Sequence, residues 1–417
     1  MHLYKKKRTV IPMIYLDSAA TTRISTEVLN AMMPYLTDEY GNAGTLYQLG
    51  RSAATAVQHS REQVAKLFRC TTEHIIFTSG GSESNNTVFQ GFRHKLTEQG
   101  KKHIVVSAIE HDSVLRAAEM LTKDGFYITY VYPEKNGVVS ASAVEAAIRD
   151  DTGLVSVMYV NNETGAVNDI HAIGQICRAH SALFHTDCVQ AAGQFEIDVD
   201  TDCIDFASVS SHKLYGPKGV GALYVRDTTL TPLIYGGSEQ EFGIRGGTEN
   251  VYGIVGFGKA CELIIENLRE NNIQLSILKQ KFFTELLDNM MKFGLERNSI
   301  HVNGRSVIES GKTLNLRFDN VDAETLLLML NTKGVCVSAG SACSSHEAKP
   351  SHVLLAMGLT PEEARSSLRF SFSKYNTGEE MECAAQTIAS CIFALQKYSE
   401  VIPDENMENP SDMGDVR

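Results

Sequence analysis

Several features that mark other classes of protein are missing from this 417-residue sequence. No apolar run approaches the length of a membrane span, and no segment resembles a signal peptide. The nine cysteines include no C-x-x-C pair, which argues against a zinc site and, without a signal peptide, against a disulfide framework. We therefore expect a cytoplasmic protein with reduced thiols, no metal site and no membrane contact.

Positive charge is also scarce. Lys and Arg number 38 against 50 Asp and Glu, so the formal net charge is −12. A general nucleic-acid binder should present a basic surface. The composition therefore argues against direct nucleic-acid binding, and any such contact would go through a partner.

The length predicts two domains, because 417 residues exceed what a single core usually holds. We expect a large domain over residues 26–255 and a smaller domain formed by residues 13–25 and 256–400. Residues 1–12, which are basic and precede Met13, are expected to be a flexible leader. Residues 401–417, which are polar and acidic, are expected to be a disordered tail.

Short apolar segments alternate with amphipathic ones through the predicted large domain. Ile75–Thr78, His103–Ser107 and Tyr127–Val131 have the length and composition of strands. This alternation predicts an α/β fold with a mostly parallel sheet that helices cover on both faces. In such a sheet the loops that follow the strands carry the chemistry. The polar candidates after strand ends are His111, Asn162, Asp187, Gln190 and Lys213.

Lys213 lies between two apolar strand segments, in S-S-H-K-L-Y-G-P-K-G. Burial there would lower the pKa of its ammonium, and an uncharged amine attacks an aldehyde to form a Schiff base. Asp187, at the end of another apolar segment, would need a cation such as a protonated pyridine nitrogen. Together they suit pyridoxal 5′-phosphate (PLP), with His111 over the ring face. The alternative is that each of these residues is structural.

A phosphate site is indicated where Ile75–Thr78 runs into the turn S-G-G-S-E-S-N-N, residues 79–86. A helix that begins there would offer free backbone N–H groups and the positive end of its dipole. The turn matches neither a Walker loop nor a dinucleotide fingerprint. A plain turn with Ser82 as the helix cap is the alternative.

Two residues of the predicted small domain also suggest chemistry. Cys343 lies in a loop of small residues, and because exposed thiols oxidise, a thiol retained there indicates a reactive group. Arg369 lies in an alternating strand segment, where its burial would require a carboxylate partner. A substrate carboxylate would fit its guanidinium group.

Nine motifs in order give a resemblance that covers roughly residues 13–400. The sequence resembles the cysteine desulfurases of the IscS/NifS type, in the class V aminotransferase-like branch of the fold-type I PLP enzymes. The motifs are Y-L-D-S-A-A-T-T (15–22), S-G-G-S-E-S-N-N (79–86), I-E-H (109–111), V-N-N-E-T-G (160–165), H-T-D-C-V-Q (185–190), S-S-H-K-L-Y-G-P-K-G (210–219), R-G-G-T (245–248), G-S-A-C-S-S (340–345) and S-S-L-R-F-S (366–371). An ordered set of this size is highly specific.

The resemblance implies a fold, a reaction and a role for each candidate. The fold would have a mostly parallel seven-stranded sheet in a large PLP-binding domain, plus a smaller α+β domain. Sulfur from L-cysteine would pass to Cys343 as a persulfide, leaving L-alanine, and then to an acceptor protein. The chain would act as a homodimer. The cofactor ligands would be Lys213, His111, Asp187, Gln190, Gly81, Ser82, Ser210 and His212, with Thr248 from the other subunit. The substrate carboxylate would be held by Asn162, Arg369 and Asn315.

The sequence departs from the family pattern at a few positions. Tyr47 replaces a usual histidine, Cys188 a usual alanine, and Gly81–Ser82 a usual Ala-Thr pair. None of these changes removes a catalytic group, but they indicate a specialised branch. Selenocysteine lyase chemistry and a partner-dependent sulfur-transfer role stay open, whereas Cys343 argues against a transaminase. The acceptor pathway also stays open among iron–sulfur clusters, tRNA thiolation and DNA phosphorothioate modification.

Overall fold

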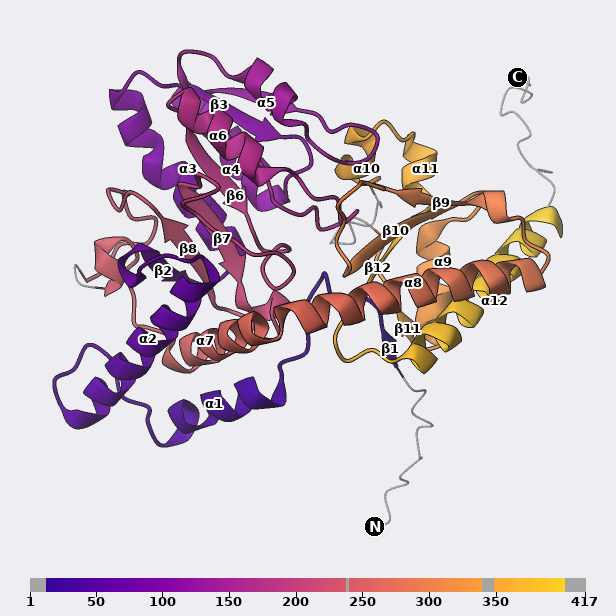
Figure 1. The fold of residues 1–417 in the computed structure, drawn as a ribbon, viewed down its shortest axis with the longest axis horizontal. Coiled ribbons are helices and arrows are strands. Elements are labelled where there is room, and N and C mark those ends of the chain that lie inside the picture. The colour runs from indigo at the N-terminus through magenta and orange to yellow at the C-terminus, as the bar shows by residue number, and fades with distance from the viewer. Residues whose placement is uncertain (1–12, 238–239, 340–348, 402–417) are drawn as a thin grey trace, which may run out of the picture.

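The computed structural model describes residues 13–237, 240–339 and 349–401. Figure 1 shows two parts side by side, one around a large sheet and one around a small sheet. The long helix α8 (Leu268–Lys292) lies along the small sheet and reaches toward the larger part.

The larger part is built on a seven-stranded sheet with the order β2-β8-β7-β6-β5-β3-β4. Its strands pair in parallel except at β8, which runs antiparallel to both of its neighbours. This confirms the predicted mostly parallel sheet. The strands are β2 (Ile75–Thr78), β3 (His103–Ser107), β4 (Tyr127–Val131), β5 (Thr152–Ser156), β6 (Leu183–Asp187), β7 (Phe206–Ser210) and β8 (Gly221–Val225).

Helices cover both faces of this sheet, as the unbroken apolar strands require. On one face, α3 (Gly81–Glu98) and α4 (Asp112–Leu121) share a buried core with the strands. On the other face, α2 (Gln48–Leu67), α6 (Ile170–Ala179) and α7 (Val251–Glu266) enclose a second core. The helices α1 (Thr26–Thr37) and α5 (Ala141–Ala147) add to it.

The smaller part contains an antiparallel sheet with the order β12-β10-β9. Its core packs this sheet against α8 and α12, with Phe282 and Phe370 in ring contact. The remaining elements are β9 (Ile300–Asn303), β10 (Thr313–Phe318), β11 (Val335–Cys336), β12 (Ser367–Ser371), α9 (Ala323–Thr332), α10 (His352–Ala356), α11 (Pro361–Arg365) and α12 (Gly378–Val401). None of the helices in the described ranges is long and apolar enough to cross a membrane.

The apolar pattern over Val255–Leu287 is typical of helical structure, and the segment is helical except at Asn267. The structure has two helices, because Asn267 leaves the helical conformation at φ −117° and ψ 18°. Its side-chain amide donates to the Leu263 carbonyl oxygen at 2.8 Å and caps the end of α7. α7 then packs on α2, whereas α8 packs on α12. The domain limits at residues 25 and 255 stay a prediction.

The segment from β1 (Ile14–Tyr15) to Thr22 links the two parts. β1 pairs in parallel with β11. The Ala19 amide donates to the Ser371 hydroxyl at 2.8 Å, in the small sheet. The Thr22 amide donates to the His212 carbonyl oxygen at 2.9 Å, beside the large sheet. The segment therefore passes between the two sheets and contacts both.

Candidate active site

The predicted site residues of the large sheet gather at one edge. Asp187 and Ser210 are the last residues of the neighbouring strands β6 and β7. Lys213 ends a short 3₁₀ turn, Ser211–Lys213, that follows β7. His111 caps the start of α4, close behind β3. The carboxyl ends of parallel strands therefore bring these side chains to one region.

The Lys213 side chain is partly buried. Its Nζ donates to the carbonyl oxygens of Ala19 at 2.6 Å and Ala20 at 2.7 Å. Burial, and after it the positive charge of Arg369, lowers the pKa of Lys213 to about 8. An amine with that pKa is uncharged in a useful fraction of molecules near neutral pH, which a nucleophilic lysine requires.

Asp187 is a buried carboxylate that forms no ion pair in the described chain. Its Oδ2 accepts from the Asn85 side-chain amide at 2.8 Å, and its Oδ1 accepts from the Val189 amide at 2.9 Å. Two neutral donors hold the carboxylate in place without cancelling its charge. A protonated ring nitrogen supplies the missing charge, so this site fits a pyridine ring.

A hydrogen-bond chain connects Asp187 to His111. The Asn85 amide also donates to the Ser113 hydroxyl at 2.9 Å, and that hydroxyl lies 2.8 Å from the His111 Nδ1. The His111 ring is exposed, as stacking on a bound molecule requires. Asn85 has no role in the sequence-based prediction, because nothing in a helix sequence tells which amide turns toward a strand end.

The turn before α3 leaves room for an anion. No side chain caps this helix, so the amides of its first turn, at Gly81 and Ser82, lack a capping partner. A Cβ atom at Gly81 would lie 2.7 Å from Val189 Cγ2, so a larger residue would crowd the turn that follows β6. The Ser82 side chain is exposed and that of Ser210 is buried. A phosphate fits this arrangement of donors.

The His212 Nδ1 lies 3.1 Å from the Thr21 hydroxyl. Burial and three nearby lysines lower the pKa of His212 to about 4, so the ring is neutral at pH 7. Gln190 is buried, and its amide nitrogen donates to the Ala19 carbonyl oxygen at 2.9 Å. Its Oε1 is buried and has no partner among the residues that the structure describes, and it suits a ring hydroxyl.

Arg369 already has a carboxylate partner. Its Nη2 donates to Asp17 Oδ1 at 2.8 Å, and its Nη1 donates to the carbonyl oxygen of Asn162 at 3.0 Å. Within the described ranges its Nε is buried and has no hydrogen-bond partner, so a further acceptor could bind there. The Asn315 side chain bonds to protein groups at both ends. Its amide nitrogen donates to the Glu163 carbonyl oxygen, and its Oδ1 accepts from the Asn303 side chain.

Two predicted residues remain, Thr248 and Cys343. Thr248 is exposed and makes no hydrogen bond within the described part of the chain. Its loop is tied to the start of α3 by the ion pair between Arg245 and Glu83 at 3.0 Å. Cys343 lies outside the described residues.

The positions that depart from the family pattern have different surroundings. Tyr47 is exposed and precedes α2. Cys188 is fully buried in the core, and burial holds the pKa of its thiol well above the usual value. Cys188 is therefore a protonated core residue.

Glu110 is a buried carboxyl that sequence reasoning missed. Its Oε1 accepts from the Ser107 hydroxyl and from the Met158 amide, and its Oε2 has no partner in the part of the chain that the structure describes. Burial raises its pKa to about 8. The Glu110 carbonyl oxygen lies 3.0 Å from His352 Nε2 in α10. Glu110, which precedes His111 in the chain, therefore contacts the end of β3, the segment after β5, and α10.

Residues 14–383 match the family described as Aminotransferase class-V. A cysteine desulfurase IscS from Methanosarcina thermophila is 39% identical over 393 residues, covering 94% of this chain and 95% of that relative. A solved NifS-like protein is 33% identical with a TM-score of 0.82, covering 91% of this chain and 98% of that one. A structure of SspA in complex with cysteine is 35% identical with a TM-score of 0.73, covering 87% of this chain and 99% of that one. The chain therefore belongs to the aminotransferase class-V family, among the cysteine desulfurases of the IscS and NifS type.

Proposed function

We propose that this protein is a PLP-dependent cysteine desulfurase that moves the sulfur of L-cysteine to Cys343 and on to an acceptor protein. One observation carries the proposal for this site. A partly buried lysine with a lowered pKa, Lys213, shares a sheet edge with the buried carboxylate of Asp187, which lacks a cation. An aldehyde-bearing pyridine ring satisfies both groups.

The cofactor would be held by residues from several loops. Lys213 would bind its aldehyde carbon, Asp187 its ring nitrogen and Gln190 its ring hydroxyl. The phosphate would be held by Gly81, Ser82, Ser210 and neutral His212, with Thr248 from a second subunit. His111 would cover the ring face. When bound, PLP acts as an electron sink for the carbon atoms of the substrate.

The other residues would orient L-cysteine and move protons. Arg369, with its unpaired Nε, would hold the substrate carboxylate together with Asn162 and Asn315. Asp17 would keep the guanidinium in position. The Lys213 amine would carry protons between substrate atoms, since its pKa of about 8 lets it both accept and release a proton near neutral pH.

Sulfur transfer breaks the carbon–sulfur bond of cysteine and forms a sulfur–sulfur bond. The Cys343 thiolate would attack the substrate sulfur, and the electron pair of the broken bond would stay on the amino acid. A proton then completes L-alanine, so no external oxidant or reductant enters this step. The persulfide on Cys343 would pass its outer sulfur to an acceptor.

A single-turnover reaction with L-cysteine tests the proposal. We would compare wild type with Lys213→Ala, Cys343→Ser and, as a control for an exposed thiol elsewhere, Cys383→Ser. Wild type and Cys383→Ser should form L-alanine and a protein persulfide in equal amounts. Lys213→Ala should lose the visible absorbance of lysine-bound cofactor. Cys343→Ser should keep that absorbance and bind cysteine but release no sulfur. Normal turnover by Cys343→Ser would contradict the proposed role of this thiol.

A further inference from the structure

The loop that leads to Thr248 is anchored by a buried ion pair. Glu241, in this loop, pairs with Arg61 of α2. The two contacts, from Arg61 Nη1 to Glu241 Oε2 and from Nη2 to Oε1, are both 2.7 Å long. Arg61 is 6% exposed and Glu241 is 7% exposed. Because the removal of two charges from water is costly, a buried ion pair needs further hydrogen-bond partners.

Both members of the pair bond to the backbone of β2. The Arg61 guanidinium donates to the Ile75 carbonyl oxygen at 2.6 Å, and Glu241 Oε2 accepts from the Phe77 amide at 2.7 Å. β2 is the outermost strand in the sheet order, and it pairs with β8. Ile75 and Phe77 are two positions apart, so their backbone groups point to the same edge of the strand. The ion pair therefore occupies the edge of β2 that has no neighbouring strand in the described sheet.

The backbone at Glu241 indicates that this contact shapes the loop. Glu241 has φ 43° and ψ 46°, and the next residue, Phe242, has φ 58° and ψ 27°. Left-handed conformations at two successive residues with a Cβ atom are unfavourable, and they persist only where the surrounding structure holds them. The Phe242 ring centre also lies 5.1 Å from the guanidinium carbon of Arg61. Arg61 therefore holds both left-handed residues against β2.

The same loop holds the other end of the turn that is predicted to bind phosphate. β2 ends immediately before this turn, residues 79–82. After the turn, the Glu83 carboxylate accepts from the Arg245 guanidinium at 3.0 Å and from the Ser79 amide at 2.8 Å. The loop therefore contacts the chain on both sides of the turn, through Glu241 before it and through Arg245 after it.

We propose that Glu241 is a positioning residue for the predicted phosphate site. Its carboxylate, paired with Arg61, fixes the end of β2, and the first amides of α3 follow directly from there. Without this ion pair, the loop would lose the contact that holds its left-handed residues, and the turn would lose a fixed position. This inference rests on the proposed binding of PLP, and it assigns a role to a residue that the proposed reaction does not use.

The test compares PLP with pyridoxal, which has the same ring and aldehyde but no phosphate. The full-length protein is stripped of PLP and titrated with each compound, and the absorbance of the lysine-bound ring gives two dissociation constants. Wild type should bind PLP more tightly than pyridoxal. Glu241→Gln keeps the size of the side chain but removes its charge, so the dissociation constant for PLP should rise about tenfold. The dissociation constant for pyridoxal should stay unchanged.

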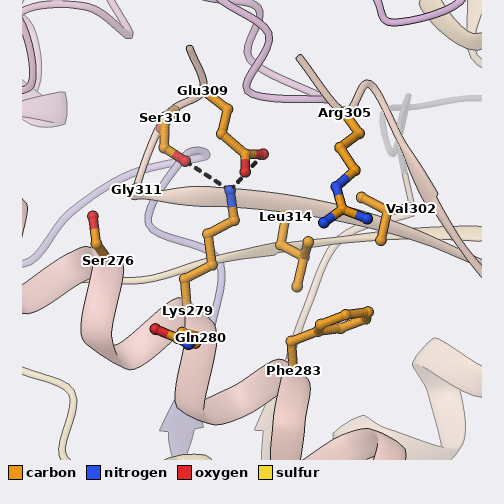
Figure 2. A pocket seen from close by; sticks show the side chains of 10 residues that line it. All are labelled: Ser276, Lys279, Gln280, Phe283, Val302, Arg305, Glu309, Ser310, Gly311 and Leu314. Carbon is orange, nitrogen blue, oxygen red and sulfur yellow. Dashed lines mark hydrogen bonds and ion pairs between the residues drawn. The ribbon is translucent and has the colours of Figure 1, made fainter. Parts of the chain in front are cut away.

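Glu309→Gln is the matched control. In Figure 2, the Glu309 carboxylate accepts from the Lys279 Nζ at 3.0 Å on the wall of a cavity in the smaller part. This ion pair joins a loop to α8, as the pair of Glu241 and Arg61 joins a loop to α2. Its removal should leave the dissociation constants for both compounds at their wild-type values.

If Glu241→Gln does not fold, Arg61→Lys replaces it with the same expectation, because lysine keeps the charge but cannot form both contacts. An equal loss of affinity for PLP and pyridoxal would mean that Glu241 supports the whole fold, and it would overturn the inference. An unchanged dissociation constant for PLP would also overturn it. Equal binding of the two compounds by wild type would overturn the phosphate site itself. If Lys213→Ala still gains the absorbance, the proposed role of Lys213 is wrong.

Discussion

At the scale of single residues, the site stands out by how its buried charges are paired. Arg369 forms an ion pair with Asp17. The Asp187 carboxylate accepts hydrogen bonds from two neutral donors and forms no ion pair with a described residue. Glu110 has hydrogen bonds to one oxygen and none to the other. Each unpaired group costs stability in the free protein. Ligands or protons that satisfy these groups should therefore stabilise the fold.

Glu110 gives a pH-dependent prediction. Burial raises its pKa from 4.5 to about 8, so between these values the folded protein keeps a proton that the unfolded chain releases. The free energy of unfolding should therefore fall by about 1.4 kcal/mol per pH unit as the pH rises through this window. Glu110→Gln does not titrate and should lose this decline. Its stability relative to wild type should increase from pH 5 to pH 8.

Urea unfolding at both pH values measures this difference. Glu98→Gln is the control, because Glu98 is exposed at the end of α3 and should follow wild type. Parallel pH trends in wild type and Glu110→Gln would show that Glu110 is not protonated in the folded state.

At the scale of elements, the start of α3 depends on an unusual backbone. Gly80 has φ 150° and ψ −179°, a conformation that residues with a Cβ rarely adopt. It lets β2 turn directly into a helix whose first amides are uncapped. The Gly80 conformation therefore determines both the turn and the position of the amides that are predicted to bind the phosphate.

Gly80→Ala should strain this turn by about 1–3 kcal/mol. Thermal unfolding should shift downward, and PLP should be lost faster on dialysis because the first amides of α3 would move. Gly44→Ala, at an exposed loop glycine without a positive φ, should change stability by less than about 0.5 kcal/mol. Equal behaviour of the two variants would remove the special role of the Gly80 conformation.

Elements and strand ends could be predicted, but the contacts between distant segments could not. Strands such as His103–Ser107 have an apolar centre between polar ends, so both their limits and the edge that carries Lys213 follow from the sequence. The boundary between α7 and α8 at Asn267 cannot be predicted, because the apolar pattern continues across it. The pairing of Asp17 with Arg369 spans 352 positions. The sequence predicts that Arg369 needs a carboxylate but not which one.

At the scale of the whole molecule, the exposed Thr248 suggests that one chain does not complete the site. In a symmetric dimer each Thr248 would serve the partner subunit, as the family resemblance implies. The ion pair between Arg245 and Glu83 would then hold the loop at the right place for that contact.

Mixed dimers test this arrangement. Lys213→Ala and Thr248→Ala subunits should each be poorly active alone. After unfolding and refolding as an equal mixture, about half of the dimers would be mixed, each with one intact site. Activity should recover to about a quarter of wild type, and PLP content should rise with it. No recovery would indicate that Thr248 serves its own subunit or has no role in the site.

The segment from β1 to Thr22 also sets an order of events during synthesis. The Ala19 amide bonds to Ser371, a residue 352 positions later, and β1 pairs with β11. On the ribosome, the strands and helices of the large sheet can emerge and pack while this early segment still lacks its partners in the small sheet. The carbonyl oxygens that receive the Lys213 amine belong to that segment. The segment that receives the Lys213 amine therefore gains its full set of contacts only after Ser371 has been translated.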